Sequence, residues 1–416
     1  MLDIKLIREK PELVRQALEK RGDSFALDGI IEIDGRYRSL LRQTEELRAK
    51  HNEASKQLST SKEKPPQLIA QMRELGEQIS SLQQQTKEAK AELDSLLLEL
   101  PNMPHPSVPL GGGPADNVVV RAWGKPAEFA FKPLPHWELG EKLGIIDFQQ
   151  GVKLSGTRFY VLKGLGAHLQ RALISFMLDI HVREHGYKEI YPPFMVRREC
   201  MIGSGNLPKF GDNLYHDEED DFWFIPTAEV PLTNLHRDEI LTADDLPLRY
   251  VAYTPCFRRE KMAAGTDTRG IKRGHQFDKV ELYRITDPAS SDEELDKLVA
   301  DAESICRKLG IAHRVVQLCT GDLGFASCKT YDIEIWAPGC AEWLEVSSCS
   351  NCSDFQARRT NIRYRPQPGA KSEFVHTLNG SGLALPRVLI AVLENYQQAD
   401  GTVLIPEALQ PYLNVA

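Results

Sequence analysis

Residues 254–281 read TPCFRREKMAAGTDTRGIKRGHQFDKVE, and this stretch constrains the fold more than any other. Two runs that are compatible with β-strands flank a segment rich in glycine and basic residues, which predicts a β-hairpin with a long cationic tip. Arg258, Arg259 and Glu260 begin the tip, and Phe277 lies on the returning strand. A guanidinium suits bidentate contact with phosphate or carboxylate, and an aromatic face suits a stacked base. The stretch is therefore either a nucleotide-binding element or a salt-bridged surface hairpin.

The composition is that of an ordinary globular chain with room for two or three domains. Of its 416 residues, 42% are hydrophobic and 26% are charged, and the formal net charge is −8. This charge argues against general coating of nucleic acid, so we expect no DNA partner and only a local basic patch for RNA. We expect no membrane partner, because no apolar run reaches membrane-spanning length and the N-terminus lacks the apolar core of a signal peptide.

The cysteines indicate a reducing, cytoplasmic location. Eight cysteines in 416 residues are too few for a disulfide scaffold. Cys349 and Cys352 form a lone CxxC, and the chain has no second ligand pair at a spacing that a structural zinc site requires. We therefore expect no zinc, and we interpret these thiols as small packed groups.

A heptad pattern occupies residues 30–100 on both sides of a Pro65–Pro66 turn. It predicts two helices of about thirty residues, each ~45 Å long, folded back as an antiparallel coiled coil. The first run comprises Ile33, Tyr37, Leu40, Thr44, Leu47, His51, Ala54 and Leu58, and the second comprises Leu68, Met72, Leu75, Ile79, Leu82, Thr86, Ala89, Leu93, Leu96 and Leu100.

The two predicted helices differ in charge. Residues 36–64 carry eight Lys or Arg and four Glu, whereas residues 67–100 carry three basic and six acidic residues. The helices could simply compensate each other's charge. Alternatively, the first helix offers a cationic edge to a phosphate backbone, with Arg42 and Lys50 as candidate contacts.

A segment rich in proline and glycine, residues 101–114, predicts a domain boundary between residues 1–106 and 107–416. The second domain combines a helix over 166–186 with short strands joined more often by turns or loops than by helices, which predicts an α+β fold on a mainly antiparallel sheet. Rossmann and P-loop glycine signatures are absent. The expected strands are 222–225, 248–251, 277–285, 312–316, 329–335 and 343–347.

Three ordered segments resemble the motifs of the class II aminoacyl-tRNA synthetases. A helix followed by YKEIYPP resembles motif 1 (about 166–193), the opening hairpin resembles motif 2 (about 250–285), and LNGSGLALPR resembles the start of motif 3 (about 378–396). The resemblance implies a class II catalytic domain flanked by helices and a homodimer, with Pro192 or Pro193 at its interface.

Within that class the chain resembles the seryl-tRNA synthetases of the bacterial type over nearly its whole length. TAE at 227–229, EVSSCSNC at 345–352 and the N-terminal arm carry this likeness. One departure is Leu385–Pro386 before Arg387, where the family often has a small residue. Proline there should set the first helical turn or kink the helix, which would change the aim of Arg387.

The resemblance implies a two-step reaction. L-serine and ATP form seryl-adenylate and pyrophosphate, and the serine then passes to the 3′-terminal adenosine of tRNA(Ser), and of tRNA(Sec). Arg258, Arg387 and Glu345 are the implied catalytic residues, and oxygen atoms of Glu345 and Ser348 suit Mg²⁺. The implied ATP-binding residues are Arg258, Arg259, Glu260, Phe277, Glu345, Val346, Ser347, Ser348 and Arg387.

A serine pocket must measure size and test for a hydroxyl group. Taken without a family resemblance, Glu281 could be a strand carboxylate paired with a nearby lysine, and Ser381 could be a helix N-cap. The resemblance implies serine contacts at Thr227, Ala228, Glu229, Arg258, Glu281, Asn379 and Ser381.

For tRNA, the resemblance implies acceptor-stem contacts at the hairpin tip, through Lys261, Arg269, Lys272 and Arg273. Two other functions compete. An amino-acid:carrier-protein ligase shares the adenylation core but lacks the arm. A non-catalytic coiled-coil protein should lack several motif residues that are present here.

Overall fold

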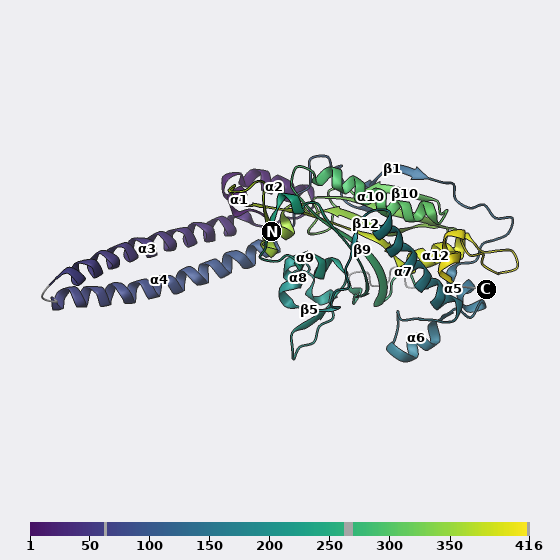
Figure 1. The fold of residues 1–416 in the computed structure, drawn as a ribbon, viewed down its shortest axis with the longest axis horizontal. Coiled ribbons are helices and arrows are strands. Elements are labelled where there is room, and N and C mark those ends of the chain that lie inside the picture. The colour runs from purple at the N-terminus through teal and green to yellow at the C-terminus, as the bar shows by residue number, and fades with distance from the viewer. Residues whose placement is uncertain (62–64, 262–268, 414–416) are drawn as a thin grey trace. The chain divides into compact units, whose positions relative to one another are not determined.

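The computed structural model describes residues 1–61, 65–261 and 269–413, and the chain divides into two compact units (Figure 1). We call the first the arm unit, which comprises Leu2–Glu19 and Asp23–Pro101. The second is the sheet unit, which comprises Met1, Lys20–Gly22 and Asn102–Ala416.

Two helices of 34 residues each, α3 (Leu27–Thr60) and α4 (Pro66–Glu99), dominate the arm unit. Each is ~51 Å long at 1.5 Å per residue, slightly longer than predicted. They run side by side as the predicted hairpin (Figure 1). The short helices α1 (Ile4–Glu9) and α2 (Pro11–Lys20) precede them. Residues 62–64, directly before the predicted Pro65–Pro66 turn, lie outside the described residues.

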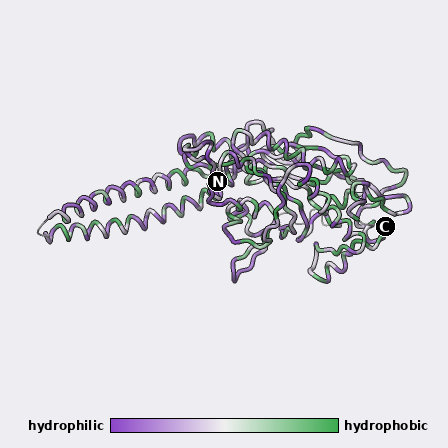
Figure 2. Tube along the Cα trace, in the orientation of Figure 1, coloured by the Kyte–Doolittle hydropathy of each residue, from purple (hydrophilic) through white to green (hydrophobic). Residues whose placement is uncertain are grey.

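Burial along α3 follows the heptad. All of residues 41–60 are described, and those that are buried or half-buried are the five seam positions Thr44, Leu47, His51, Ala54 and Leu58. Hydrophobic residues are interspersed among hydrophilic ones along both helices (Figure 2). An ion pair between Arg36 and Glu92 joins the two helices across the seam. The predicted coiled-coil arm is confirmed, because a 3.5-residue repeat places one stripe of side chains against the partner helix.

An eight-stranded sheet organises the sheet unit, in the order β1-β10-β11-β12-β15-β9-β8-β4. Every neighbouring pair is antiparallel except β4 and β8. The predicted mainly antiparallel α+β fold is therefore confirmed. The strands are β1 (Val118–Trp123), β4 (Lys188–Glu189), β8 (Leu248–Phe257), β9 (Gln276–Thr286), β10 (His313–Gln317), β11 (Lys329–Ala337), β12 (Glu342–Asn351) and β15 (His376–Ala384).

The remaining strands form small sheets. The predicted strand 222–225 is β6 (Phe222–Phe224), which pairs with β5 and lies outside the large sheet. The sequence analysis did not predict β1 or β15. The other strands are β2 (Ile146–Asp147), β3 (Val161–Leu162), β5 (Met195–Arg197), β7 (Ile240–Thr242), β13 (Arg363–Arg365) and β14 (Glu373–Phe374).

Helix α7 (Leu165–Arg183), close to the predicted 166–186, packs on the sheet because apolar residues recur on one of its faces. Leu169, Leu173 and Phe176 on this face are buried in the main hydrophobic core, with α10 (Ser291–Lys308) and α12 (Leu385–Asn395). The other helices are α5 (His136–Lys142), α6 (Phe148–Ser155), α8 (Arg198–Ser204), α9 (Glu229–Asn234), α11 (Phe355–Thr360) and α13 (Gln410–Leu413).

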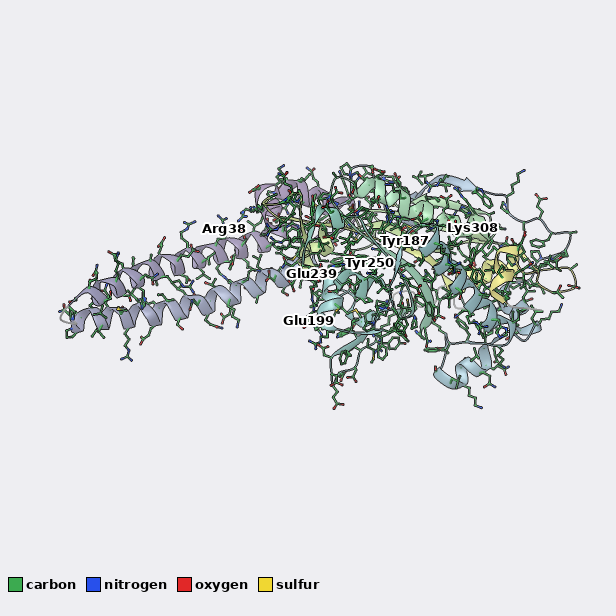
Figure 3. The ribbon with its side chains drawn as sticks, viewed as in Figure 1. Arg38, Tyr187, Glu199, Glu239, Tyr250 and Lys308 are labelled. Atoms are coloured by element: carbon green, nitrogen blue, oxygen red, sulfur yellow. The ribbon has the colours of Figure 1, made fainter. Side chains whose placement is uncertain are left out.

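A buried polar network ties the motif 1 segment to the sheet. Tyr187, which is labelled in Figure 3, donates a hydrogen bond to Asp301 at 3.0 Å and accepts one from Arg284 at 2.8 Å. Arg284 also pairs with Glu294. Charged groups are rarely buried without such partners. The network therefore fixes where the segment that follows α7 meets β9 and α10.

Strands β8 and β9 form the predicted hairpin, and their last pair is Phe257 with Gln276. Residues 258–275 connect the strands, and 262–268 of the predicted tip lie outside the described residues.

Among the described helices, none has an apolar stretch long enough to cross a membrane. Cys349 and Cys352 are buried, and burial raises the pKa of both thiols, which supports their interpretation as packed groups.

Candidate active site

A cavity of about 350 Å³ opens on one face of the large sheet. Its walls come from β9, β12, β15 and the first turn of α12, together with the segment that follows β8 and loops around Asn206 and Phe325. Twelve of the residues expected in the site line this cavity: Thr227, Glu229, Arg258, Glu260, Phe277, Glu281, Glu345, Val346, Ser348, Asn379, Ser381 and Arg387.

Arg258 and Arg387 reach this cavity from segments far apart in the chain. The Arg258 Nε donates to the Pro226 carbonyl at 3.2 Å. Arg387 donates through Nη1 to the Glu345 carbonyl at 2.5 Å, and its guanidinium lies 3.4 Å from the Glu345 carboxylate. These contacts hold two cations at one cavity, where they can bind the phosphates of a single ligand.

Phe277 offers a flat wall to the cavity. The guanidinium of Arg258 lies 5.0 Å from the centre of its ring, within cation–π range. Glu260 adopts a left-handed backbone conformation with φ of 50°, and its carboxylate lies 3.5 Å from Arg273. An aromatic ring and a carboxylate in the same cavity provide stacking and hydrogen-bond acceptance for a purine.

Pro386 occupies the first turn of α12, whose N-cap is Ala384. A proline is tolerated there because the first helical N–H groups have no intrahelical partner. The neighbouring Arg387 lines the cavity. The departure from the family pattern therefore sets the start of the helix and leaves Arg387 beside the cavity.

A second group of lining residues is acidic, with Glu281 buried and Glu229 half-buried. Glu229 accepts hydrogen bonds from Gln356 at 2.6 Å and from Asn379 at 3.0 Å. Burial, with the nearby Glu281 carboxylate, raises the pKa of Glu229 to about 7. A nearby positive charge would stabilise the ionised form of this carboxyl, so Glu229 is suited to binding a small cationic group.

Lys279 is a site residue that the sequence analysis did not single out. Its Nζ donates to Thr227 Oγ1 at 2.8 Å and lies 2.5 Å from a carboxylate oxygen of Glu281, and it lines the cavity. Glu281 is therefore paired with a lysine, as one interpretation predicted, and it also lines the cavity. The signal was available, because residues two apart on a strand share a face.

Ser381 lies within β15 and not at the start of a helix, so its N-cap interpretation is wrong. The pairing of β15 with β9 shifts register between Ser381 and Ala384, and the Ser381 carbonyl accepts a hydrogen bond from the buried Ser347 at 2.6 Å. Such bulges re-aim side chains beside binding sites. The bulge gives Ser381 its place in the cavity wall.

Glu345 and Ser348 lie on β12 and both line the cavity. Opposite Ser348 on β11 is Asp332, whose Oδ1 atom is buried without a hydrogen-bond partner among the described residues. Burial and the charge of Glu345 raise the pKa of Asp332 well above its ordinary value. This local excess of carboxylate oxygen fits a hard divalent cation.

Three expected residues do not line the cavity. Ala228 is fully buried, and the buried Ser347 donates a hydrogen bond to the Ser381 carbonyl. Arg259 donates to the Leu214 carbonyl at 2.7 Å and lies 4.6 Å from the ring centre of Tyr215, away from the lining residues. Neighbouring residues near a strand end point in different directions, so the adjacent arginines separate.

The tip residues expected to contact tRNA also separate. Lys272 and Arg273 line the cavity, and the Lys272 ammonium forms an ion pair with Glu342. Arg269 lies 5.2 Å from the ring centre of Trp137. Lys261 is exposed. Lys272 and Arg273 can therefore contact a ligand that is bound in the cavity.

Comparison with known proteins follows the same division of the chain. Residues 1–104 match the seryl-tRNA synthetase N-terminal domain, and residues 212–396 match the tRNA synthetase class II core domain (G, H, P, S and T). A serine–tRNA ligase from Thermomicrobium roseum is 60% identical over 99% of this chain and 93% of the relative. One from Roseiflexus sp. is also 60% identical, over 99% of this chain and 98% of the relative.

A solved structure carries the same likeness. Seryl-tRNA synthetase from Pyrococcus horikoshii, complexed with ATP, is 42% identical and superimposes with a TM-score of 0.93, covering 99% of this chain and 98% of the other. The chain therefore belongs to the seryl-tRNA synthetase family.

Proposed function

We propose that this chain is a serine–tRNA ligase that activates L-serine with ATP and transfers it to the 3′-terminal adenosine of tRNA(Ser). The observation that carries the proposal is that Arg258 and Arg387 line one cavity with the half-buried Glu229 and the buried Glu281. Two cations fit a bent triphosphate, and the two acids fit a small polar amino acid. Relatives named serine–tRNA ligase, matched over nearly the whole chain, support it.

In the first step the serine carboxylate attacks the α-phosphorus of ATP and displaces pyrophosphate. Arg258 binds the α-phosphate and the serine carboxylate, and Arg387 binds the γ-phosphate end. Glu260 accepts a hydrogen bond from the adenine amino group, and Phe277 stacks on the base. Such a step depends more on fixed positive charge and alignment than on proton transfer.

Glu345 and Ser348 would hold Mg²⁺, and the carboxylate-rich surroundings at Asp332 support this assignment. When bound, Mg²⁺ neutralises phosphate charge and orients the pyrophosphate group. Arg387 contacts both the backbone and the carboxylate of Glu345, so the cation-binding and phosphate-binding side chains are held together by the protein itself.

The serine pocket distinguishes its substrate by charge and by a hydroxyl group. Glu229 receives the α-ammonium, with Thr227 beside it, and Glu281 with Ser381 receives the hydroxyl. Alanine or glycine would offer no hydroxyl group to the buried Glu281, so its remaining hydrogen-bonding capacity would be unused, which is unfavourable. Lys279 offsets the charge of Glu281.

We assign residues 1–106 to tRNA binding and residues 107–416 to catalysis. Arg42 and Lys50 are exposed on α3, where they can meet the RNA backbone. M. kandleri SerRS, solved in complex with A. aeolicus tRNA(Sec), shares the fold. We include tRNA(Sec) as a second acceptor, because recognition by shape and backbone does not require the anticodon.

The protein acts as a cytoplasmic homodimer, with the end of motif 1 at the dimer interface. Tyr191, beside Pro192 and Pro193, is 81% exposed in the single chain, which supports an interface there. The sparse cysteines, eight in 416 residues, support the reducing location.

The carrier-protein ligase alternative loses its support, because the N-terminal domain match includes the arm.

The test is pyrophosphate exchange with serine, threonine, alanine and glycine, followed by charging of tRNA(Ser). We expect exchange with serine to exceed that with alanine or glycine by about 10⁴-fold. Equal exchange with alanine and serine would contradict the assignment of the hydroxyl-binding residues. Serine-dependent exchange without any tRNA charging would contradict the ligase function.

A further inference from the structure

A buried polar cluster lies beside the cavity but contributes no residue to its lining. His136 and Glu394 are fully buried, and Cys340 is partly buried. The His136 Nδ1 and one Glu394 oxygen are 2.8 Å apart, and the Cys340 thiol lies 3.1 Å from the same oxygen. The other Glu394 oxygen accepts hydrogen bonds from the backbone N–H groups of Gly339 and Cys340, at 2.8 and 3.0 Å.

These three side chains have the types and spacing of a metal site, but their hydrogen bonds favour another role. The backbone N–H of Ile271 donates to the His136 Nε2 at 3.1 Å, so this nitrogen is the acceptor. Nδ1 of a neutral ring must then carry the proton, which it donates to Glu394. A protonated nitrogen has no lone pair for a metal, so the cluster is a closed hydrogen-bond network.

The network joins two segments that supply cations to the cavity. Ile271 lies on the returning limb of the 254–281 hairpin, next to Lys272, which lines the cavity. Glu394 lies two turns after Arg387 on α12. The two segments also meet directly, because Arg387 Nε donates to the Lys272 carbonyl at 3.5 Å.

The His136 ring packs closely against the backbone of Gly270 on the hairpin limb. A Cβ atom added to Gly270 would lie 2.0 Å from the His136 Nε2, and Gly270 has a φ of 75°. The neighbouring Trp137 ring lies 5.2 Å from the Arg269 guanidinium and 5.9 Å from the Lys272 ammonium. The start of α5 therefore sets the path of residues 269–272.

We propose that His136 is a positioning residue that fixes Lys272 and Arg387 relative to each other, so that both cations meet the β,γ end of ATP. The inference rests on the proposed function, because that function places the triphosphate beside Arg387. His136 acts through the Ile271 backbone and through Glu394, and it touches no substrate.

The test separates the two hydrogen bonds of the ring. In His136→Asn the amide can replace Nδ1 and donate to Glu394, but it cannot reach Ile271. In His136→Gln the longer side chain can place its oxygen where Nε2 was and accept from Ile271. Binding of ATP and of AMP by calorimetry, and the KM values for ATP and serine in pyrophosphate exchange, are measured for both variants.

We expect His136→Asn to weaken ATP binding about tenfold, the effect of one hydrogen bond, while AMP affinity and the KM for serine change less than twofold. His136→Gln should recover most of the ATP affinity. The matched control is His313→Asn, because His313 is another buried histidine, 3.1 Å from the buried Glu303, and does not line the cavity. The control should leave the ratio of ATP to AMP affinity unchanged.

Equal weakening of ATP and AMP, or the same selective loss in His313→Asn, would overturn the proposal. So would stoichiometric zinc in the purified wild-type protein that is lost in His136→Asn. If His136→Asn does not fold, Glu394→Gln replaces one acceptor with a donor, and the same selective loss of ATP affinity is expected of it. Failure of wild-type exchange with serine contradicts the proposed function instead, since ATP and AMP binding are measured without serine.

Discussion

The arm unit and the cavity of the sheet unit are built from contacts of very different range in the sequence. In the arm, α3 and α4 meet along a stripe whose members recur every three or four residues. In the cavity, Arg258 follows β8, Glu345 lies on β12 and Arg387 lies on α12. The spacing of apolar residues in the sequence is therefore enough to predict which side chains pack in the arm. It does not predict which side chains meet in the cavity.

The two regions also differ in how they hold charge. Arg36 and Glu92 pair at the arm surface, where both side chains are about half exposed. Lys279 and Glu281 pair in the cavity wall with side chains 8% and 2% exposed. Water screens the first pair and not the second, so removing one member of the buried pair should have a much larger effect.

Glu281→Ala should have the largest effect on activity. Loss of this buried acceptor removes the hydroxyl test, and we expect serine-dependent pyrophosphate exchange to fall by about 10⁴-fold in kcat/KM. The control is Glu334→Ala, because Glu334 is also a strand carboxylate with a basic partner, Arg314, and does not line the cavity. Exchange that survives in Glu281→Ala would remove the specificity argument.

Replacing residues 36–94 with a short turn should separate the two regions functionally. We expect the exchange rate to stay within about threefold of wild type, since the deletion removes no cavity residue. Charging of tRNA(Ser) should fall at least about 100-fold, because the exposed cations of α3 are lost. Aminoacylation and exchange are compared at equal enzyme concentration, and equal loss of both would contradict the assignment of the arm to tRNA.

The pH dependence of serine binding should report on Glu229. Its pKa is raised to about 7, so below pH 7 the carboxyl is mostly protonated and attracts the serine ammonium weakly. Affinity should rise by up to about tenfold per pH unit as pH approaches 7 and then level off. The KM for serine is measured from pH 5.5 to 8, and Glu229→Gln should abolish the rise. A rise of the same size in that variant would assign the titration to another group.

Arg36→Ala should have the smallest effect. An exposed ion pair contributes about 0.5 kcal/mol, so urea unfolding of the arm should change by no more than that. Arg73→Ala provides the comparison, because Arg73 pairs with Glu77 within α4 alone. Destabilisation of more than about 1 kcal/mol by Arg36→Ala would show that the arm also depends on specific long-range contacts.

The motifs predicted most of the residues that line the cavity, but they did not predict which of two adjacent residues faces it. Arg258 and Arg259 are adjacent and of the same type, yet only Arg258 lines the cavity, and Arg259 lies on Tyr215. Which of two adjacent arginines faces a cavity depends on the loops that pack beside the strand end. Lys279 could have been paired with Glu281 from strand alternation alone.

The sequence by itself determined the coiled-coil arm, the hairpin of β8 and β9 and the antiparallel character of the sheet, because helical and strand periodicities are local properties of the chain. Only the tertiary structure decided that Arg258 and Arg387 share one cavity, that a bulge in β15 places Ser381 in its wall, and that His136 joins the hairpin to α12. Those outcomes depend on packing between segments more than a hundred residues apart, which no local pattern encodes.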